Sequence, residues 1–185
     1  MLKILIVEDD KQLATTLKYL VEDNPRYRVV AVVDDLEGAI EAAEHDAPDL
    51  ALVETAADGA ALDGEGQCLA TAVYFESMGE PLQGQLAVAN VVINRAHSGR
   101  YPASLCGVVK QRAQFSFVRN GRFPRINTAC QAWRKAQAIA RIATANTMAA
   151  LPTDVLWYHA DYVAPKWRSN LVKVSKIGAH IFYRG

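Results

Sequence analysis

The sequence of 185 residues has no long apolar run, so it contains no segment resembling a membrane-spanning helix, which takes about 20 consecutive apolar residues. Its first residues, Met1-Leu-Lys, begin a short strand-like run, and no signal-peptide core with a small-residue cleavage site follows. The sequence therefore predicts no membrane span and leaves the compartment unknown.

Cysteine is scarce. The chain has three cysteines, at positions 68, 106 and 130. A disulfide between Cys68 and Cys106 would form in an oxidising compartment and leave Cys130 unpaired, whereas three reduced thiols fit the spacing equally well. Spacing does not decide between these two states.

Metal-binding motifs are missing as well. The chain has no His-Glu-x-x-His helix of the kind that holds zinc in metallopeptidases. His159, Asp161 and His180 come nearest to a ligand set, but the two histidines fall on separate predicted strands. We predict no metal and no cofactor, and structural or substrate-contacting roles for the histidines.

Charge is distributed unevenly along the chain. Residues 1–60 hold 14 Asp and Glu against 5 Lys and Arg, a net charge of −9, whereas residues 61–185 hold 6 against 15, a net charge of +9. A cationic domain suits an anionic polymer as its partner. Nucleic acid is the weaker candidate, because the basic residues are scattered and no nucleic-acid-binding motif accompanies them.

One acid of the basic part stands among apolar neighbours. Glu76 follows Tyr74 and Phe75 and is followed closely by Met78. A carboxyl group beside apolar side chains loses hydration in its charged form, which raises its pKa and keeps it protonated near neutral pH, as a general acid requires. Glu76 is therefore the candidate catalytic residue, and a surface or helix-capping acid is the alternative.

Two helices are predicted to meet at this acid. Residues 67–78 carry apolar side chains at helical spacing, which places Glu76 in the last turn before Gly79. A second, almost wholly apolar helix is predicted to start at Glu80 and Pro81, with Pro81 at its first position.

The rest of the basic part alternates between turns, one helix and strands. Asn120-Gly121, within residues 115–123, predicts a hairpin turn that forms a lip of a cleft. Asn127 is the predicted N-cap of a long helix. Residues 155–163 and 171–183 are predicted to be terminal strands.

Beyond these patterns, the sequence from residue 68 onward resembles the cell-wall hydrolases of the SleB/CwlJ type. The matching segments follow the family's order: Cys68-Leu-Ala, Tyr74-Phe-Glu-Ser-Met-Gly-Glu-Pro81, Gly84-Gln-Leu-Ala-Val-Ala-Asn-Val-Val-Ile-Asn-Arg95, Tyr101-Pro102, Cys106-Gly-Val-Val109, Gln114-Phe-Ser-Phe117, Trp133, Trp157-Tyr-His159, Pro165-Lys-Trp167 and Ile177-Gly-Ala-His-Ile-Phe-Tyr-Arg184. The resemblance implies a peptidoglycan-cleaving domain with a lysozyme-like core related to lytic transglycosylases. It also implies that Glu76 matches the family's catalytic Glu, although the family's usual Glu-Ala-Arg-Gly-Glu is Glu-Ser-Met-Gly-Glu here, without the arginine.

The scarcity of acids bears on the reaction. A retaining or inverting hydrolase needs a second carboxylate about 5–9 Å from the acid, and the other acids after residue 61 are Asp63, Glu65, Glu80, Asp154 and Asp161. A single acid suits a lytic transglycosylase, in which Glu76 protonates the glycosidic oxygen and then accepts a proton from the muramoyl 6-hydroxyl. The alternatives are an amidase acting on the stem peptide and a signalling or wall-binding module without catalysis.

Ten further residues are candidates for binding the sugar chain, each with a core or scaffold role as its alternative. Six are polar and suited to hydrogen bonding with hydroxyl or N-acetyl groups: Glu80, Gln85, Asn94, Gln114, Ser116 and His159. Four are aromatic and suited to stacking on a pyranose ring: Tyr74, Phe115, Trp157 and Tyr183.

Residues 1–55 follow a different pattern. Apolar runs alternate with two amphipathic helices in the order strand, helix, strand, helix, strand, which goes with parallel pairing. These segments resemble the first half of a CheY-type response-regulator receiver, a βαβαβ unit of flavodoxin-like fold, with Glu8 and Asp9 at its metal-binding acidic pair. Glu54 stands where that family has its phosphoacceptor Asp, and no fourth or fifth strand follows, so phosphorylation is not expected.

The whole sequence thus predicts an α+β chain in three parts. Residues 1–55 form the receiver-like unit, residues 56–66 a linker, and residues 67–185 a mostly helical catalytic domain with small terminal β-hairpins. So small a first unit buries little surface alone and is expected to dock on the catalytic part or on another copy, or else to be an inert appendage. The expected partner is the glycan strand of peptidoglycan, which implies the cell envelope or periplasm.

Overall fold

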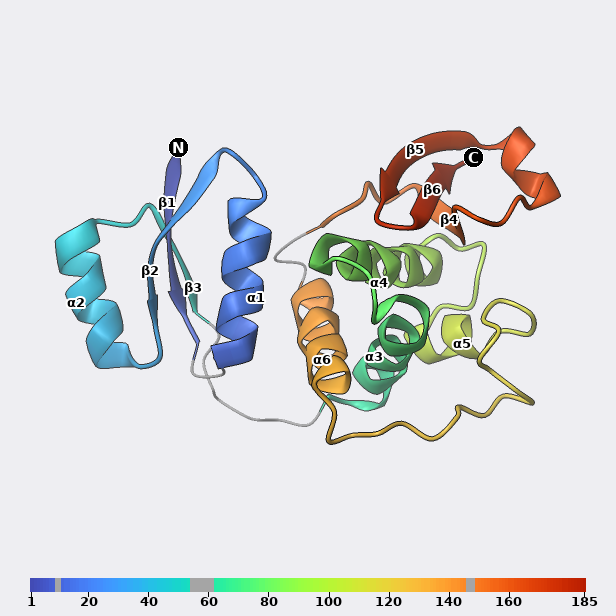
Figure 1. Ribbon diagram of the computed structural model, residues 1–185, viewed down its shortest axis with the longest axis horizontal. Coiled ribbons are helices and arrows are strands. Elements are labelled where there is room, and N and C mark those ends of the chain that lie inside the picture. Colours follow the sequence, from blue (N-terminus) through green and yellow to red (C-terminus); the bar gives the residue numbers. More distant parts are fainter. Residues whose placement is uncertain (9–10, 54–61, 146–148) are drawn as a thin grey trace. The chain divides into compact units, whose positions relative to one another are not determined.

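The computed structural model describes residues 1–8, 11–53, 62–145 and 149–185. The chain divides into two compact units, Met1–Ala61 (unit 1) and Leu62–Gly185 (unit 2) (Figure 1). Asp9, Glu54 and residues 56–61 of the predicted linker lie outside the described residues.

Unit 1 is a three-stranded parallel sheet with a helix on each face. Its elements are β1 (Leu2–Val7), α1 (Lys11–Glu22), β2 (Tyr27–Val33), α2 (Leu36–Asp46) and β3 (Leu50–Val53). The strand order is β2-β1-β3, and the central strand β1 pairs in parallel with both neighbours. Helices α1 and α2 lie on opposite sides of the sheet (Figure 1). The predicted element order and parallel pairing are confirmed.

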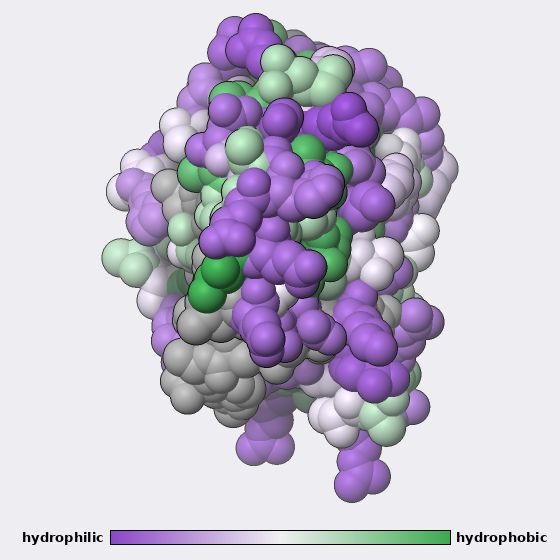
Figure 2. Space-filling model, turned by 90° about the vertical axis from the view of Figure 1, so that its left-hand side faces the viewer, coloured by the Kyte–Doolittle hydropathy of each residue, from purple (hydrophilic) through white to green (hydrophobic). Residues whose placement is uncertain are grey.

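The core of unit 1 is built around β1. Ile4, Leu5 and Ile6 are almost completely buried, because helices cover both faces of this central strand. The edge strand β3 is less protected, and the side chain of Leu50 is 54% exposed. The outer face seen in Figure 2, on the side where α2 lies in Figure 1, is mainly hydrophilic with hydrophobic side chains scattered over it.

Unit 2 begins with helices that pack around an apolar centre. They are α3 (Gly64–Ser77), α4 (Leu82–His97), α5 (Leu105–Lys110) and α6 (Gln131–Thr144). Leu69, Val88 and Ile139, from three of them, are fully buried. Helix α3 starts earlier than its apolar pattern predicts, because the side chain of Asp63 caps it by accepting a hydrogen bond from the Gly66 amide. Residues 64–66, assigned to a linker from composition, therefore form its first turn.

A small antiparallel sheet closes unit 2. Its strands β4 (Val155–Ala160), β5 (Val172–Ile177) and β6 (His180–Arg184) are arranged in the order β4-β6-β5, and a 3-10 helix, η1 (Lys166–Asn170), precedes β5. Val155 and Phe182 are fully buried against α4. Residues 171–183, predicted to be strand, form part of a hairpin, as the predicted terminal β-hairpins require: the chain reverses at Gly178, whose φ of +56° suits glycine.

Two short-range predictions have opposite outcomes. The predicted turn at Asn120-Gly121 is confirmed, since both residues have positive φ and the backbones of Arg119 and Arg122 exchange two hydrogen bonds across it. The predicted N-cap of α6 is wrong. The Cys130 thiol accepts from the Trp133 amide there, and Asn127 instead forms a local turn by accepting from the Ala129 amide.

A disulfide joins two helices of unit 2, α3 and α5, through cysteines that are 38 residues apart in sequence. Cys68 in α3 is bonded to Cys106 in α5, and Cys130 is a free thiol. Of the two redox states that the spacing allows, the structure contains the oxidised one. None of the helices in the described residues is long and apolar enough to cross a membrane.

Candidate active site

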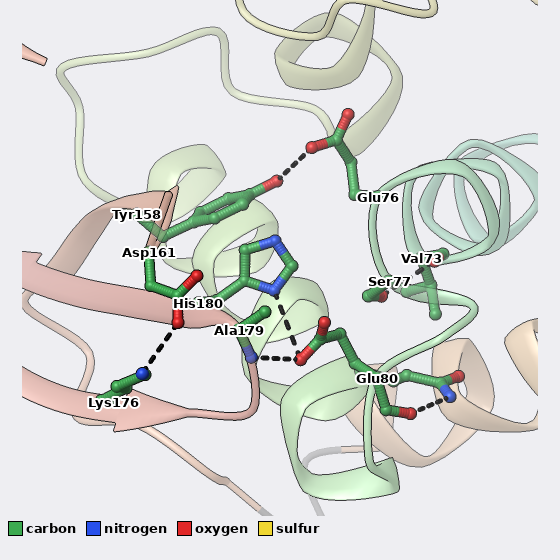
Figure 3. Close-up of polar contacts among 10 residues, drawn as sticks. Val73, Glu76, Ser77, Glu80, Tyr158, Asp161, Lys176, Ala179 and His180 are labelled. Atoms are coloured by element: carbon green, nitrogen blue, oxygen red, sulfur yellow. Dashed lines mark hydrogen bonds and ion pairs between the residues drawn. The ribbon is translucent and has the colours of Figure 1, made fainter. Parts of the chain in front are cut away.

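Glu76 lies in the last turn of α3 and points toward the sheet. The helix ends at Ser77, whose buried hydroxyl donates back to the Val73 carbonyl at 2.8 Å. Opposite Glu76, the Tyr158 hydroxyl of β4 donates a hydrogen bond to Glu76 Oε2 at 3.2 Å (Figure 3). The partly buried acid is thus held from two segments of unit 2 that are 82 residues apart.

The electrostatic environment of Glu76 favours its protonated form. Burial raises the pKa of the Glu76 carboxyl above its ordinary value, and this effect outweighs the hydrogen bond from Tyr158 and the positive charge of Arg95, which both lower it. Burial, with the neighbouring Glu76 charge, raises the pKa of the Tyr158 hydroxyl well above its ordinary value. Tyr158 therefore stays a neutral hydrogen-bond donor.

Arg95 provides a buried cation close to this pair. Its side chain is 5% exposed, and its Nε donates to the Leu156 carbonyl at 2.7 Å. The guanidinium lies over the Tyr101 ring at 5.1 Å from its centroid. Its positive charge acts on Glu76 and lowers the pKa of that carboxyl.

A second acid, Glu80, is committed to holding the fold. Its Oε2 accepts a hydrogen bond from the Ala179 amide at 2.8 Å and lies 3.8 Å from His180 Nδ1. A side chain on Gly178 would collide with the same carboxylate oxygen, so the β5–β6 turn requires glycine there. Glu80 therefore fastens the start of α4 to the sheet.

His180 separates the two acids. Its ring lies between Tyr158 and Glu80, with its plane edge-on to the Tyr158 ring at 5.2 Å (Figure 3). Burial lowers the pKa of His180, although Glu80 and Asp161 partly offset this. The lowered pKa favours the neutral imidazole, and this ring lies between Glu80 and the Tyr158 side chain that contacts Glu76 (Figure 3).

Three predicted sugar-binding residues are not brought to Glu76. Trp157, His159 and Tyr183 share one face of the sheet, where His159 Nε2 and the Tyr183 hydroxyl are 2.9 Å apart. Side chains alternate between the faces of a strand, so Tyr158, between Trp157 and His159, points the other way. The face of Tyr158, not theirs, meets Glu76, so sugar contacts by Trp157, His159 and Tyr183 on the other face stay a prediction.

Three other predicted residues make internal contacts. Gln85 is 2% exposed and donates its amide to the Glu80 carbonyl. Asn94 is 8% exposed and donates to the carbonyls of Pro152 and Val155. Tyr74 lies edge-on to Trp133 of α6 at 5.9 Å. Their polar groups and rings hold helices and loops together rather than facing Glu76.

The predicted residues of the 114–116 segment lie next to Phe117, which stacks on Phe75, the residue before Glu76 in α3. Phe115 is buried, whereas Gln114 and Ser116 are exposed. Ser116 lines a hollow of about 430 Å³ whose wall includes Phe75, the residue before Glu76 in α3.

The residues weighed as metal ligands have other partners. Asp161 forms an ion pair with Lys176 at 2.8 Å, and His159 Nδ1 lies 2.8 Å from the Ala160 carbonyl. Within the part of the chain that the structure describes, no three His, Cys, Asp or Glu side chains gather as a metal site would require.

Tyr158 and Arg95 are not among the candidates chosen from sequence, and His180 was weighed there only with the other histidines, as a metal ligand or a structural or substrate-contacting residue. The alternation of the strand Trp157-Tyr-His159 contained a signal for Tyr158, because only one face of a strand can meet the acid. Arg95 had a weaker signal, as a lone cation at the end of an apolar helix.

Comparison with known proteins finds relatives for unit 2. The family described as Cell Wall Hydrolase matches residues 79–183, starting just after Glu76. A spore cortex-lytic enzyme of Bacillus cereus is 35% identical over 116 residues, which are 63% of this chain and 42% of that protein. One from Bacillus subtilis is 31% identical over 117 residues, 62% of this chain and 35% of that protein. The chain thus spans less than half the length of these curated relatives.

Two solved structures are similar to unit 2. The catalytic domain of the germination-specific lytic transglycosylase SleB from Bacillus anthracis superposes with a TM-score of 0.55 at 32% identity, covering 69% of this chain and 99% of that one. The catalytic domain of the Bacillus cereus SleB protein gives 0.54 at 32% identity, covering 65% and 89%. These likenesses confirm the α+β fold predicted for this part of the chain.

Proposed function

The chain belongs to the cell wall hydrolase family, and from this premise we propose that unit 2 is a peptidoglycan-cleaving enzyme that acts as a lytic transglycosylase on the bond between muramoyl and glucosaminyl residues. The observation that supports it most is the half-buried Glu76 carboxyl with the Tyr158 hydroxyl on one of its oxygens. Relatives named as spore cortex-lytic enzymes and as a lytic transglycosylase support the same reaction class.

In the proposed reaction Glu76 acts first as an acid and then as a base. Tyr158 donates to Oε2, which leaves Oε1 to carry the proton to the glycosidic oxygen as the C1–O bond breaks. The resulting carboxylate accepts the proton of the muramoyl 6-hydroxyl, whose oxygen bonds to C1 and closes an anhydro ring. The Tyr158 hydrogen bond and the Arg95 charge stabilise the carboxylate between these steps.

The positions of the other acids favour this route over hydrolysis with two carboxylates. Glu80, the nearest in sequence, is bonded to the Ala179 amide beyond His180. Each remaining acid of unit 2 contacts another group: Asp63 contacts Gly66, Glu65 contacts Cys106, Asp154 contacts Arg184 and Asp161 contacts Lys176. None of these contacts directs a second carboxylate toward Glu76.

The test of catalysis is Glu76→Gln, with Asp154→Asn as the matched control in an exposed acid. We expect Glu76→Gln to abolish clearing of purified cell walls, with its circular dichroism unchanged, and Asp154→Asn to retain activity. If the unaltered chain and the Glu76→Gln variant both bind walls and neither clears them, the protein is a non-catalytic binding module.

Mass spectrometry of the digest separates the reaction types. Anhydro-muramoyl ends are expected. Reducing muramoyl ends would show hydrolysis, and release of peptides from intact glycan strands would show a stem-peptide amidase. Either result would overturn the transglycosylase assignment.

For unit 1 we propose a truncated receiver without phosphotransfer. The parallel β2-β1-β3 sheet between two helices, with the buried Glu8 after β1, supports this origin. Incubation with acetyl phosphate followed by intact-mass measurement tests it: no phosphorylated species is expected, and an increment of one phosphoryl group would contradict the proposal.

We place the site of action in the cell envelope. The substrate proposed for Glu76 lies there, and the Cys68–Cys106 disulfide fits an oxidising compartment.

A further inference from the structure

The hollow lined by Phe75, the residue before Glu76 in α3, combines aromatic walls with two arginines. Phe75 of α3 stacks on Phe117 with 4.8 Å between ring centroids, and Phe117 contacts Phe123 at 6.2 Å. Arg119 and Arg122, on either side of the Asn120-Gly121 turn, complete the lining of this cavity of about 430 Å³. Aromatic walls with a few charged groups at the rim are typical of binding sites for small polar molecules.

The two arginines have no acidic partner in unit 2. Both side chains are exposed, and their mutual hydrogen bonds join backbone atoms only. Unit 2 has six acidic residues, all within its described ranges, and each bonds to another group: Asp63 to Gly66, Glu65 to Cys106, Glu76 to Tyr158, Glu80 to Ala179, Asp154 to Arg184 and Asp161 to Lys176. The positive charge at the hollow is therefore available to a ligand.

Further positive charge lies next to the hollow. Lys110 Nζ lies 5.2 Å from the centroid of the Phe123 ring. Two guanidinium groups on a rigid turn suit a carboxylate, since an arginine fork can donate two parallel hydrogen bonds to it. The aromatic walls suit the apolar face of a ring attached to that carboxylate.

We propose that Arg119 and Arg122 bind a carboxylate carried on the 3-O-lactyl arm of a muramoyl residue while the aromatic walls contact its sugar ring. This rests on the proposed function, because it names the feature of the glycan that the same site selects. The carboxylate has two possible sources: the lactyl group itself where the peptide is absent, and the stem peptide where it is present.

The experiment uses the full chain and the double variant Arg119→Gln/Arg122→Gln. Because the turn is held by backbone hydrogen bonds, this change is expected to leave it intact. The control, Arg134→Gln/Arg168→Gln, removes the same charge from exposed positions that do not line the hollow. Three soluble substrates are compared: peptide-bearing glycan, glycan stripped of peptide, and stripped glycan whose lactyl carboxyls have been converted to neutral methylamides.

We expect the Arg119/Arg122 variant to lose about tenfold in kcat/KM on carboxylate-bearing glycan, the effect of one lost charge-assisted contact, and to match the unaltered chain on the neutral glycan. Loss on the peptide-bearing glycan alone assigns the carboxylate to the peptide, and loss on the stripped glycan alone assigns it to the lactyl group.

Equal losses on charged and neutral glycan, no loss, or the same loss in the control would overturn this inference alone, since the unaltered chain would still cleave. Failure of the unaltered chain to cleave any of the three substrates would overturn the proposed function, and this inference with it.

Discussion

The pKa of Glu76 is set by opposing effects. Burial favours the neutral carboxyl, whereas Tyr158 and Arg95 favour the carboxylate, and burial is the largest of the three. This balance suits a group that must first hold a proton and then release it in the same cycle. The pH dependence of the protein should report it directly.

The first prediction concerns pH. The folded-state pKa of Glu76 lies above its unfolded value, so between the two values the folded protein binds more protons, and its stability falls as pH rises through that window. Clearing activity should fall as pH rises through the folded pKa. In urea unfolding, Glu76→Gln should be more stable than the unaltered chain above the window and equal to it below. Parallel pH profiles for the two proteins would refute this.

The second prediction concerns Tyr158→Phe. Removing a hydroxyl that donates to the carboxylate should lower kcat/KM by roughly 10- to 100-fold. It should also shift the alkaline limb of the pH profile upward, because that hydrogen bond lowers the pKa of Glu76. The control is Tyr162→Phe, at a side chain that is 85% exposed. A lower rate with an unmoved alkaline limb would mean that Tyr158 acts on the fold alone.

The residues to which the sequence alone points are those whose signal is local. Glu76 stands out because its neighbours along the chain are aromatic, and Asn120-Gly121 because that dipeptide tolerates positive φ. The contacts of Tyr158 and His180 with the two acids span many residues of sequence, so strand alternation indicates the face on which Tyr158 lies but not the acid that it contacts. Trp157 and His159 are prominent as residue types, but strand alternation turns them away from the acid.

At the scale of elements, the β5–β6 turn and the start of α4 are joined through one carboxylate. Glu80 was expected either to contact the sugar or to cap α4, whereas Pro81 is the N-cap residue of that helix and the Glu80 side chain reaches Ala179. The predicted helices and strands came mostly from periodicity and were largely correct, while their ends depended on caps and turns that single side chains decide.

The third prediction tests that junction. Gly178→Ala should destabilise unit 2 by about 1–3 kcal/mol, because it places a side chain at positive φ and against the Glu80 carboxylate. Gly79→Ala, where added atoms meet open space, is the control and should change little. Urea unfolding measures both. In a Glu80→Ala background the cost of Gly178→Ala should shrink, and an unchanged cost would argue against the collision.

The fourth prediction concerns the disulfide between α3 and α5. Replacing Cys68 and Cys106 by serine should lower the free energy of unfolding by about 2–4 kcal/mol, largely by freeing the unfolded chain. Cys130→Ser, at the free thiol, serves as the control. Thermal unfolding with and without reductant gives the readout: the reductant should lower the Tm of the unaltered chain and leave the double serine variant unaffected.

At the scale of the whole molecule, the neutral total charge conceals two units of opposite sign. Residues 1–60 carry a net −9 and residues 61–185 a net +9. Composition alone revealed this division. Any effect of unit 1 on unit 2 depends on contacts that composition does not encode.

The fifth prediction follows from that division. A chain of residues 62–185, comparable in extent to the separately solved catalytic domain from Bacillus anthracis, should retain lytic activity. Freed of the acidic unit, it should bind anionic walls several-fold more tightly at low salt, and this gain should vanish near 1 M salt, where the screening length is about 3 Å. Co-sedimentation with purified walls measures it. Equal binding by both chains at every salt concentration would show that unit 1 does not affect wall affinity.

The hydrogen bond between Tyr158 and Glu76 also makes lytic activity sensitive to the position of the sheet relative to the helices of unit 2. Glu76 belongs to a helix and Tyr158 to a strand more than eighty residues later, so a slight displacement of the sheet would break this hydrogen bond and abolish the proposed activity while the helices remain folded. On gentle warming, lysis should therefore fade before the far-ultraviolet helical signal does.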